Sequence, residues 1–90
     1  METELKLLAR FGEVGAGLMA DIAAADGDAV RLAGLAHRLK GAARTVGAMR
    51  LGDLAAALER SGSASDAAGL QAEWQRVSAA LRAGGETGSA

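Results

Sequence analysis

Apolar residues between Ala29 and Val46 recur at steps of three and four, and this spacing constrains the fold more than any other feature of the sequence. The positions are Leu32, Leu35, Ala36, Leu39, Ala43 and Val46. At about 100° per residue they fall within one stripe roughly 100° wide, as in a helix packed on a core. Asp28 can cap the start of this helix, and Gly47 can end it in a left-handed turn. The sequence therefore predicts an amphipathic helix over residues 29–46.

The segment before this helix predicts two pieces, because glycines interrupt it. Residues 2–11 form a short amphipathic pattern with one apolar side: Leu5, Leu8 and Phe11. The glycines at positions 12, 15 and 17 then weaken a helix by up to about 1 kcal/mol each relative to Ala. The apolar pattern resumes with Val14, Leu18, Ile22 and Ala25, ahead of a turn signal at Asp26-Gly27. We therefore expect a short extra N-terminal helix followed by a longer one.

Two more amphipathic helices follow. The first covers residues 49–60, and its inner face is Leu51, Leu54, Ala55 and Leu58. A serine-rich loop over residues 61–65 precedes the second, which Ser65 or Asp66 can cap. The second helix carries Leu70, Trp74, Val77 and Leu81. Residues 84–90 have no substantial apolar side chain to bury and are predicted to form a disordered tail.

The number of helices and their short connections favour antiparallel neighbours. Phe11 and Trp74 are the only aromatic residues, so the core must be thin and built from Leu and small side chains. Ninety residues are enough for one such core but not for two. We predict an all-α fold, an up-down antiparallel four-helix bundle with the short extra N-terminal helix, in one domain over residues 1–83.

Composition excludes several classes of function. The absence of Cys removes disulfides, zinc ribbons and thiol chemistry. A net charge of −1 argues against a nucleic-acid binder. The longest apolar runs are far short of the roughly 20 residues that span a bilayer, and no signal peptide is evident. We therefore expect a cytoplasmic monomer that engages neither nucleic acid nor membrane.

The only histidine, His37, lies about 150° from the centre of the apolar stripe and so should face solvent. Its surface neighbours three and four residues away are Ala33, Gly34, Lys40 and Gly41, and Arg44 lies one turn further along. Two glycines on one face of a helix are locally unfavourable, which suggests that something approaches the backbone closely beside the histidine.

The charge around the histidine is one-sided. No acidic residue occurs between Asp28 and Asp53, whereas five residues there are basic: Arg31, Arg38, Lys40, Arg44 and Arg50. A run of this kind can simply be a solvated helix face. It can also offer positive charge to an anion held at the imidazole.

The motif Ala36-His37-x-Leu39-Lys40-Gly41-x-Ala43 is followed by Gly47-Ala48, Leu51-x-x-Leu54 and Leu58-Glu59. In order and spacing this string resembles the histidine-containing phosphotransfer (HPt) domain family. Asp28, nine residues before the histidine, also matches the usual start of the histidine helix in that family. The resemblance covers roughly residues 18–60.

The resemblance implies that His37 accepts a phosphoryl group from the aspartyl phosphate of one receiver domain and delivers it to the aspartate of another. It also implies that neighbouring residues contact the phosphoryl group or the receiver, namely Lys40, Gly41, Arg44, Arg38, Gly34 and Ala33. The receiver would supply Mg²⁺ and the acidic pocket. The chain would then be a phosphocarrier without an ATP site, a cofactor or a metal of its own.

Other interpretations remain open. The phosphoacceptor domain of a chemotaxis-type histidine kinase shares the His-x-x-Lys-Gly motif, but its donor is ATP held by a separate catalytic domain. The dimerisation domain of a sensor kinase typically has Pro soon after the histidine, and this sequence contains no Pro. A non-catalytic helical interaction module is the third alternative. A self-sufficient enzyme is disfavoured by the single His, the missing Cys and the absence of a Gly-x-x-x-x-Gly-Lys loop.

Overall fold

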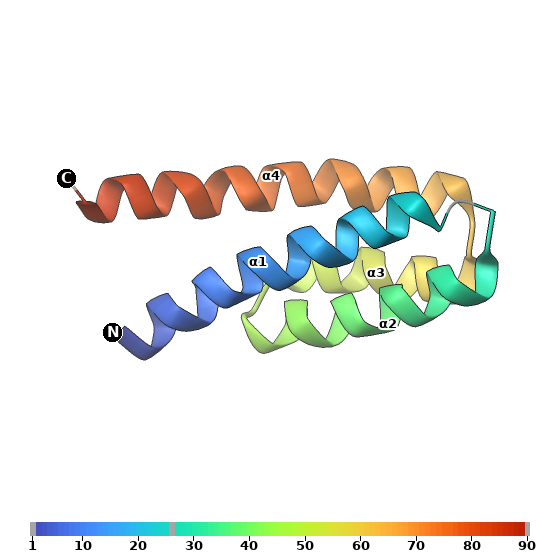
Figure 1. Ribbon diagram of the computed structural model, residues 1–90, viewed down its shortest axis with the longest axis horizontal. Coiled ribbons are helices and arrows are strands. Elements are labelled where there is room, and N and C mark those ends of the chain that lie inside the picture. Colours follow the sequence, from blue (N-terminus) through green and yellow to red (C-terminus); the bar gives the residue numbers. More distant parts are fainter. Residues whose placement is uncertain (1, 26, 90) are drawn as a thin grey trace.

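Four helices make up the part of the chain that the structure describes. The structure is a computed structural model that describes the backbone of residues 2–25 and 27–89 and the side chains of residues 6–25 and 27–83. The helices are α1 (Glu2–Ala24), α2 (Ala29–Thr45), α3 (Met49–Ser61) and α4 (Ala64–Ser89), with no strand among the described residues. In Figure 1, α1 and α3 run from left to right and α2 and α4 from right to left. The predicted all-α fold is confirmed.

Each helix packs on two neighbours. The pairs in contact are α1 with α2, α2 with α3, α3 with α4, and α1 with α4, and the α2–α3 pair is the most extensive. The core between them consists of Phe11, Leu18, Met19, Ile22, Ala25, Leu32, Leu35, Ala36, Leu39, Ala43, Leu51, Ala55, Leu58, Leu70 and Trp74. The predicted inner face of residues 29–46 accounts for five of these positions, all on α2. The opposite face of α2 is left to solvent.

The predicted break near the N-terminus is wrong, because α1 is one continuous helix from Glu2 to Ala24. Its glycines lie inside the helix, and Gly15 has a packing role there. A Cβ on Gly15 would stand 2.6 Å from Cζ3 of the Trp74 ring, so the indole occupies the space that a side chain would fill. Phe11 meets the same ring edge-on, with the centroids 5.8 Å apart. Gly15 lowers the helix propensity of α1, but it allows the Trp74 ring to pack against the helix, and this buried aromatic contact offsets the cost.

The buried face of α1 also differs from the expected one. Phe11, Leu18, Ile22 and Ala25 are buried as predicted, but Val14 and Leu8 are 43% and 38% exposed. Gly15 and Met19 take the inward positions instead. The side chain of Leu5 and all of Asp26, in the predicted turn, lie outside the described residues, whereas Gly27 has the positive φ (88°) expected of that turn.

Both ends of α2 follow the predicted capping. The Asp28 side chain accepts a hydrogen bond from the backbone N–H of Arg31 at 3.1 Å. At the other end, Gly47 has φ +80°, and the N–H of Ala48 bonds back to the carbonyl of Ala43 at 2.8 Å. This left-handed ending satisfies carbonyls in the last turn that would otherwise lack partners. It also directs the chain back into α3, antiparallel to α2.

The connection from α3 to α4 is shorter than the predicted loop. Helix α3 ends at Ser61 and α4 begins at Ala64, so the cap is Ser63 rather than Ser65 or Asp66. The Ser63 hydroxyl accepts from the N–H of Asp66 at 3.1 Å. At the far end, the backbone of α4 continues as a helix to Ser89, where a disordered tail was expected from residue 84. No Pro occurs in this stretch to stop a helix that Ala80, Leu81 and Ala83 favour.

Candidate functional site

His37 lies in the middle of α2, on the side of the helix that faces away from the core. Its side chain is 66% exposed, whereas Ala36 and Leu39 beside it in the sequence are fully buried. The orientation expected from the apolar periodicity is therefore confirmed. An imidazole in this position is open to a macromolecular partner rather than enclosed in a pocket of its own chain.

A carboxylate from the neighbouring helix holds the ring. Oε2 of Glu59, on α3, lies 2.7 Å from Nδ1 of His37. The other carboxylate oxygen, Oε1, accepts a hydrogen bond from Nζ of Lys40 at 2.6 Å. Glu59 thus bridges two α2 residues that are one helical turn apart, and its own side chain is 29% exposed. We call His37, Lys40 and Glu59 the histidine cluster.

The charge state of Glu59 assigns the proton on the ring. Two hydrogen bonds lower the pKa of Glu59 from its ordinary value of 4.5. The bond from Lys40 has the larger effect and the bond from His37 the smaller, while partial burial acts in the opposite direction. An ionised carboxylate can only accept hydrogen bonds, so Nδ1 must carry the proton that it donates. In the neutral ring the lone pair is then on Nε2. No hydrogen bond within the described residues engages Nε2, so the lone pair of the outer nitrogen has no partner there.

The other predicted cations lie at different distances from the cluster. Arg44 leans toward α3, where Nη2 lies 3.9 Å from Oδ1 of Asp53 and its Cγ occupies the space beside Gly52. Because both partners are largely exposed, this pair contributes at most about 1 kcal/mol. Arg38 is exposed, about 100° around the helix from His37, and takes part in none of the ion pairs of the described residues. The structure therefore brings Lys40 to the histidine but not Arg38 or Arg44.

The small residues of the exposed face behave as the helical wheel predicts. Gly34 and Gly41 are exposed, and a Cβ at either position would meet no atom within 4 Å. Neither glycine is therefore needed for helix packing. Ala33, on the same side, is partly buried. Because Gly34 and Gly41 have no side chains, little projects from the helix on either side of the imidazole, and the backbone of another protein can approach the His37 ring closely.

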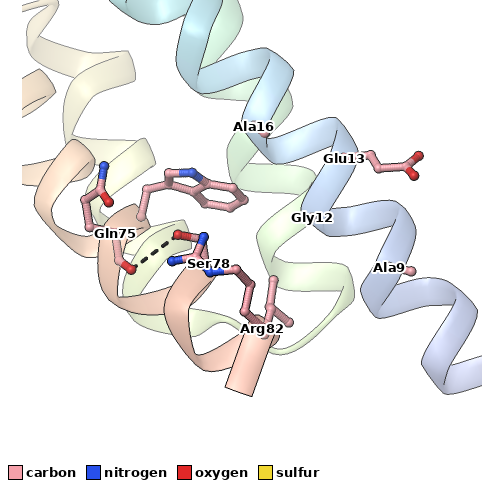
Figure 2. A pocket seen from close by; sticks show the side chains of 9 residues that line it. Ala9, Gly12, Glu13, Ala16, Gln75, Ser78 and Arg82 are labelled. Carbon is pink, nitrogen blue, oxygen red and sulfur yellow. Dashed lines mark hydrogen bonds between the residues drawn. The ribbon is translucent and has the colours of Figure 1, made fainter. Parts of the chain in front are cut away.

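One hollow lies away from the histidine cluster. It has a volume of about 530 Å³ and lies between α1 and α4. Figure 2 shows Gly12 and Ala16 of α1 facing Gln75, Ser78 and Arg82 of α4, while Glu13 points away from α4. The only hydrogen bond drawn there joins the Ser78 hydroxyl to the Gln75 carbonyl at 3.2 Å. The hollow thus offers no nucleophile paired with a base.

The described residues contain neither a metal-ion cluster nor a membrane-spanning helix. No group of three or more His, Cys, Asp or Glu side chains lies close enough together to hold a metal ion. No helix in this part of the chain is long and apolar enough to cross a membrane. The histidine cluster is therefore the arrangement with the clearest chemistry.

Residues 6–84 match the Hpt domain family. The chain belongs to the Hpt domain family. Hpt domains carry phosphoryl groups on histidine in two-component signalling, and receiver domains are their partners. This Hpt domain places its single histidine on the exposed face of α2, where such a partner can reach it. No curated protein and no solved structure matches the chain significantly.

The contact between Glu59 and His37 could not be predicted from the sequence. The residue was part of the string Leu58-Glu59 that resembles the family, but nothing in the spacing of one helix shows which side chain of another will meet His37. The available signal was periodicity. Leu51, Ala55 and Leu58 define the inner face of α3, and Glu59, next in sequence to Leu58, lies at the edge of that face. An acidic residue at the edge of a helix packed against the basic α2 is a plausible partner for its cations.

Proposed function

We propose that this Hpt domain carries a phosphoryl group on Nε2 of His37 between the aspartates of receiver domains in a phosphorelay. The observation that supports the proposal most directly is the hydrogen bond between Nδ1 of His37 and Glu59, at 2.7 Å. It leaves the nucleophilic nitrogen on the exposed side of the ring. Family membership supports the reaction class, and the exposed position of the single histidine in the sequence supports His37 as the residue.

The transfer step can be written from the residues present. The Nε2 lone pair attacks the phosphorus of a receiver's aspartyl phosphate, the N–P bond forms, and the bond from phosphorus to the aspartate oxygen breaks. The aspartate leaves as a carboxylate. The ring retains its Nδ1 proton and gains positive charge, which the ionised Glu59 stabilises. Delivery to the second receiver is the reverse reaction, with the aspartate oxygen as nucleophile.

Lys40 is the cation placed to interact with the transferred group. It lies one turn from His37 and is joined to Glu59 at 2.6 Å, with its side chain 21% exposed. Phosphoryl transfer depends mainly on positioning and on neutralising the equatorial oxygens. We propose that Lys40 screens phosphoryl charge at Nε2, that Arg44 and Arg38 contribute at longer range, and that the low surface at Gly34, Gly41 and Ala33 admits the receiver.

The donor and acceptor pockets belong to the partner under this proposal. The receiver brings the aspartate and its Mg²⁺, and the chain acts as a phosphocarrier without a cofactor of its own. The phosphoacceptor domain of a chemotaxis-type kinase remains the second candidate, since the same exposed histidine could receive phosphate from ATP held by a catalytic domain. The geometry of α2 does not distinguish these two donors. Labelling by a chemotaxis-type catalytic domain with ATP, compared with labelling by a phosphorylated receiver, distinguishes them.

The test uses the purified chain with two donors. A receiver domain phosphorylated by acetyl phosphate should transfer its label to the parental chain, and the same chain incubated with ATP and Mg²⁺ alone should stay unlabelled. Labelling from ATP alone would identify the chain as a kinase. No transfer from any phosphorylated receiver, with a helical and folded chain, would favour the interaction-module alternative.

A further inference from the structure

The exposed side of α2 carries a second repeat with steps of four and three, opposite the core stripe. Its members are Val30, Gly34, His37, Gly41 and Arg44. At about 100° per residue they all lie within about 60° of His37 on the helical wheel. The stripe is therefore a continuous surface with the imidazole at its centre and glycine on either side. Its two ends differ, because one is an aliphatic side chain and the other a guanidinium.

Val30 has no evident role in folding. Its side chain is 85% exposed, more than any other large apolar side chain described, and it does not belong to the core cluster or to the partly buried residues around it. It is the second residue of α2, after the Asp28 cap and Ala29. A β-branched residue gives no advantage in helix propensity there. The isopropyl group of Val30 is thus exposed to solvent on the same face of α2 as His37.

The distances along the helix are set by its geometry. Val30 lies seven positions before His37, and Arg44 lies seven positions after it. At 1.5 Å per residue each end lies about 10 Å from the histidine along the axis. A protein surface that covers His37 and rests on Gly34 and Gly41 will reach both ends. It will meet apolar surface at the N-terminal end of α2 and positive charge at the C-terminal end.

We propose that Val30 is an apolar anchor of the docking face and sets, together with Arg44, the direction in which a receiver lies along α2. This inference rests on the proposed function. The receiver that fits has an apolar side chain about 10 Å to one side of its phosphoacceptor aspartate and an acidic group about as far to the other side. Docking in the reverse direction would place the acidic group on Val30 and the apolar group on Arg44. Receivers with other patterns are thereby disfavoured.

Two variants of Val30 separate the loss of apolar contact from the gain of charge. Val30→Thr keeps the shape but exchanges a methyl for a hydroxyl, and loss of one buried methyl corresponds to about a fourfold rise in KM for the phosphorylated receiver. Val30→Asp should raise KM by about tenfold or more, because docking would bury an unpaired carboxylate against the receiver's apolar side chain. The rate at saturating receiver should stay within about twofold of the parent for both, since the chemistry at Nε2 is unchanged.

The probe is a receiver domain that is phosphorylated by acetyl phosphate and labels the parental chain. Ala79→Asp is the matched control for added charge, because Ala79 is exposed on α4, which does not contact α2 within the described residues. The thermal midpoint of Val30→Asp should equal or exceed that of the parent, since an acidic residue in the first helical turn is favourable. Arg44→Ala should also raise KM, but its effect should fade as salt is added, whereas the effect of Val30→Thr should not.

The outcomes are distinguishable. If both Val30 variants keep the parental KM while His37 still takes the label, the anchor is refuted and the proposed function stands. If Val30→Thr lowers the saturated rate and leaves KM unchanged, Val30 does not act through docking, and the inference fails. If the parental chain takes no label on His37 from any receiver, the proposed function itself fails. A KM increase for Val30→Thr and Val30→Asp, but not for Ala79→Asp, is the result that supports the anchor.

Discussion

Nδ1 of His37 and Oε2 of Glu59 lie 2.7 Å apart across the contact between α2 and α3. This contact joins the His37 ring on α2 to a residue of α3. It assigns the proton to Nδ1 and directs the lone pair to Nε2. The ring orientation is thus a property of helix packing as much as of the histidine helix itself.

Removing this contact should slow transfer without unfolding the chain. We expect Glu59→Ala to lower the rate of transfer from a phosphorylated receiver by on the order of tenfold, since it removes a charge-assisted hydrogen bond that orients the ring. Glu59→Gln is the matched control, because its amide oxygen can still accept a hydrogen bond from Nδ1–H of His37. It should retain more of the rate. Equal losses in both variants would mean that the carboxylate charge, rather than the hydrogen bond to Nδ1, is what matters.

Gly41 tests the low surface beside the histidine. A Cβ there would meet nothing within 4 Å, so Gly41→Gln should raise the free energy of unfolding by up to about 1 kcal/mol. The same side chain should obstruct a receiver and slow transfer strongly. Gly69→Gln on α4 is the matched control, because Gly69 is also open to solvent and within a helix. It should stabilise the chain and leave transfer unchanged. A marked fall in the thermal midpoint of Gly41→Gln would show instead that this glycine is a packing residue.

Gly15 and Gly17 form a matched pair for the packing of α1. Gly15→Ala forces a methyl against the Trp74 ring and should destabilise the fold by about 1–3 kcal/mol. Gly17→Ala, with nothing within 4 Å, should stabilise it by up to about 1 kcal/mol. Denaturant unfolding of the two variants measures the difference. Stabilisation by both substitutions would mean that the indole does not pack on Gly15 as described.

Glu73 predicts a pH dependence of stability. This carboxylate is buried on α4 and bonded to Arg76 and Arg50, and the hydrogen bond from Arg76 is the largest influence that lowers its pKa below the ordinary 4.5. A group whose pKa is depressed by folding stabilises the fold above its unfolded pKa, and this stabilisation is lost as the pH falls through the folded pKa. The thermal midpoint should therefore decline as the pH is lowered below about 4.5.

Glu73→Gln should flatten part of that decline and lower the midpoint at neutral pH, where the two arginines lose their charged partner. Glu13→Gln is the control, because Glu13 is exposed and forms none of the ion pairs of the described residues. It should leave the curve unchanged. If the thermal midpoints of the parent and of Glu73→Gln fell in parallel as the pH was lowered from neutral to below about 4.5, Glu73 would not be a source of the pH dependence.

The histidine helix could be predicted from the sequence because its determinants are local. Asp28, the periodic apolar residues and Gly47 all lie within or next to α2, and each acts through contacts over a few residues. The exposed position of His37 and the open surface at Gly34 and Gly41 follow from the same periodicity. These features needed no knowledge of the other helices.

The features that were missed depend on contacts between helices. Gly15 weakens an isolated helix, and only the Trp74 ring, far along the chain, explains why α1 continues through it. The inward position of Gly15 also accounts for the exposure of Val14, which the periodic pattern had placed inside. Glu59 reaches His37 only once α2 and α3 are packed. Propensity along one segment cannot supply this information.

The central claim is that His37 carries the phosphoryl group, and the most direct measurement is the location and stability of the label after transfer from a phosphorylated receiver. We predict one phosphoryl group that is lost in acid, survives alkali and maps to the peptide containing His37. We also predict that His37→Gln takes no label while its circular dichroism spectrum keeps the helical content of the parent. Label retained in His37→Gln, or an acid-stable phosphate on another residue of the parent, would contradict the account.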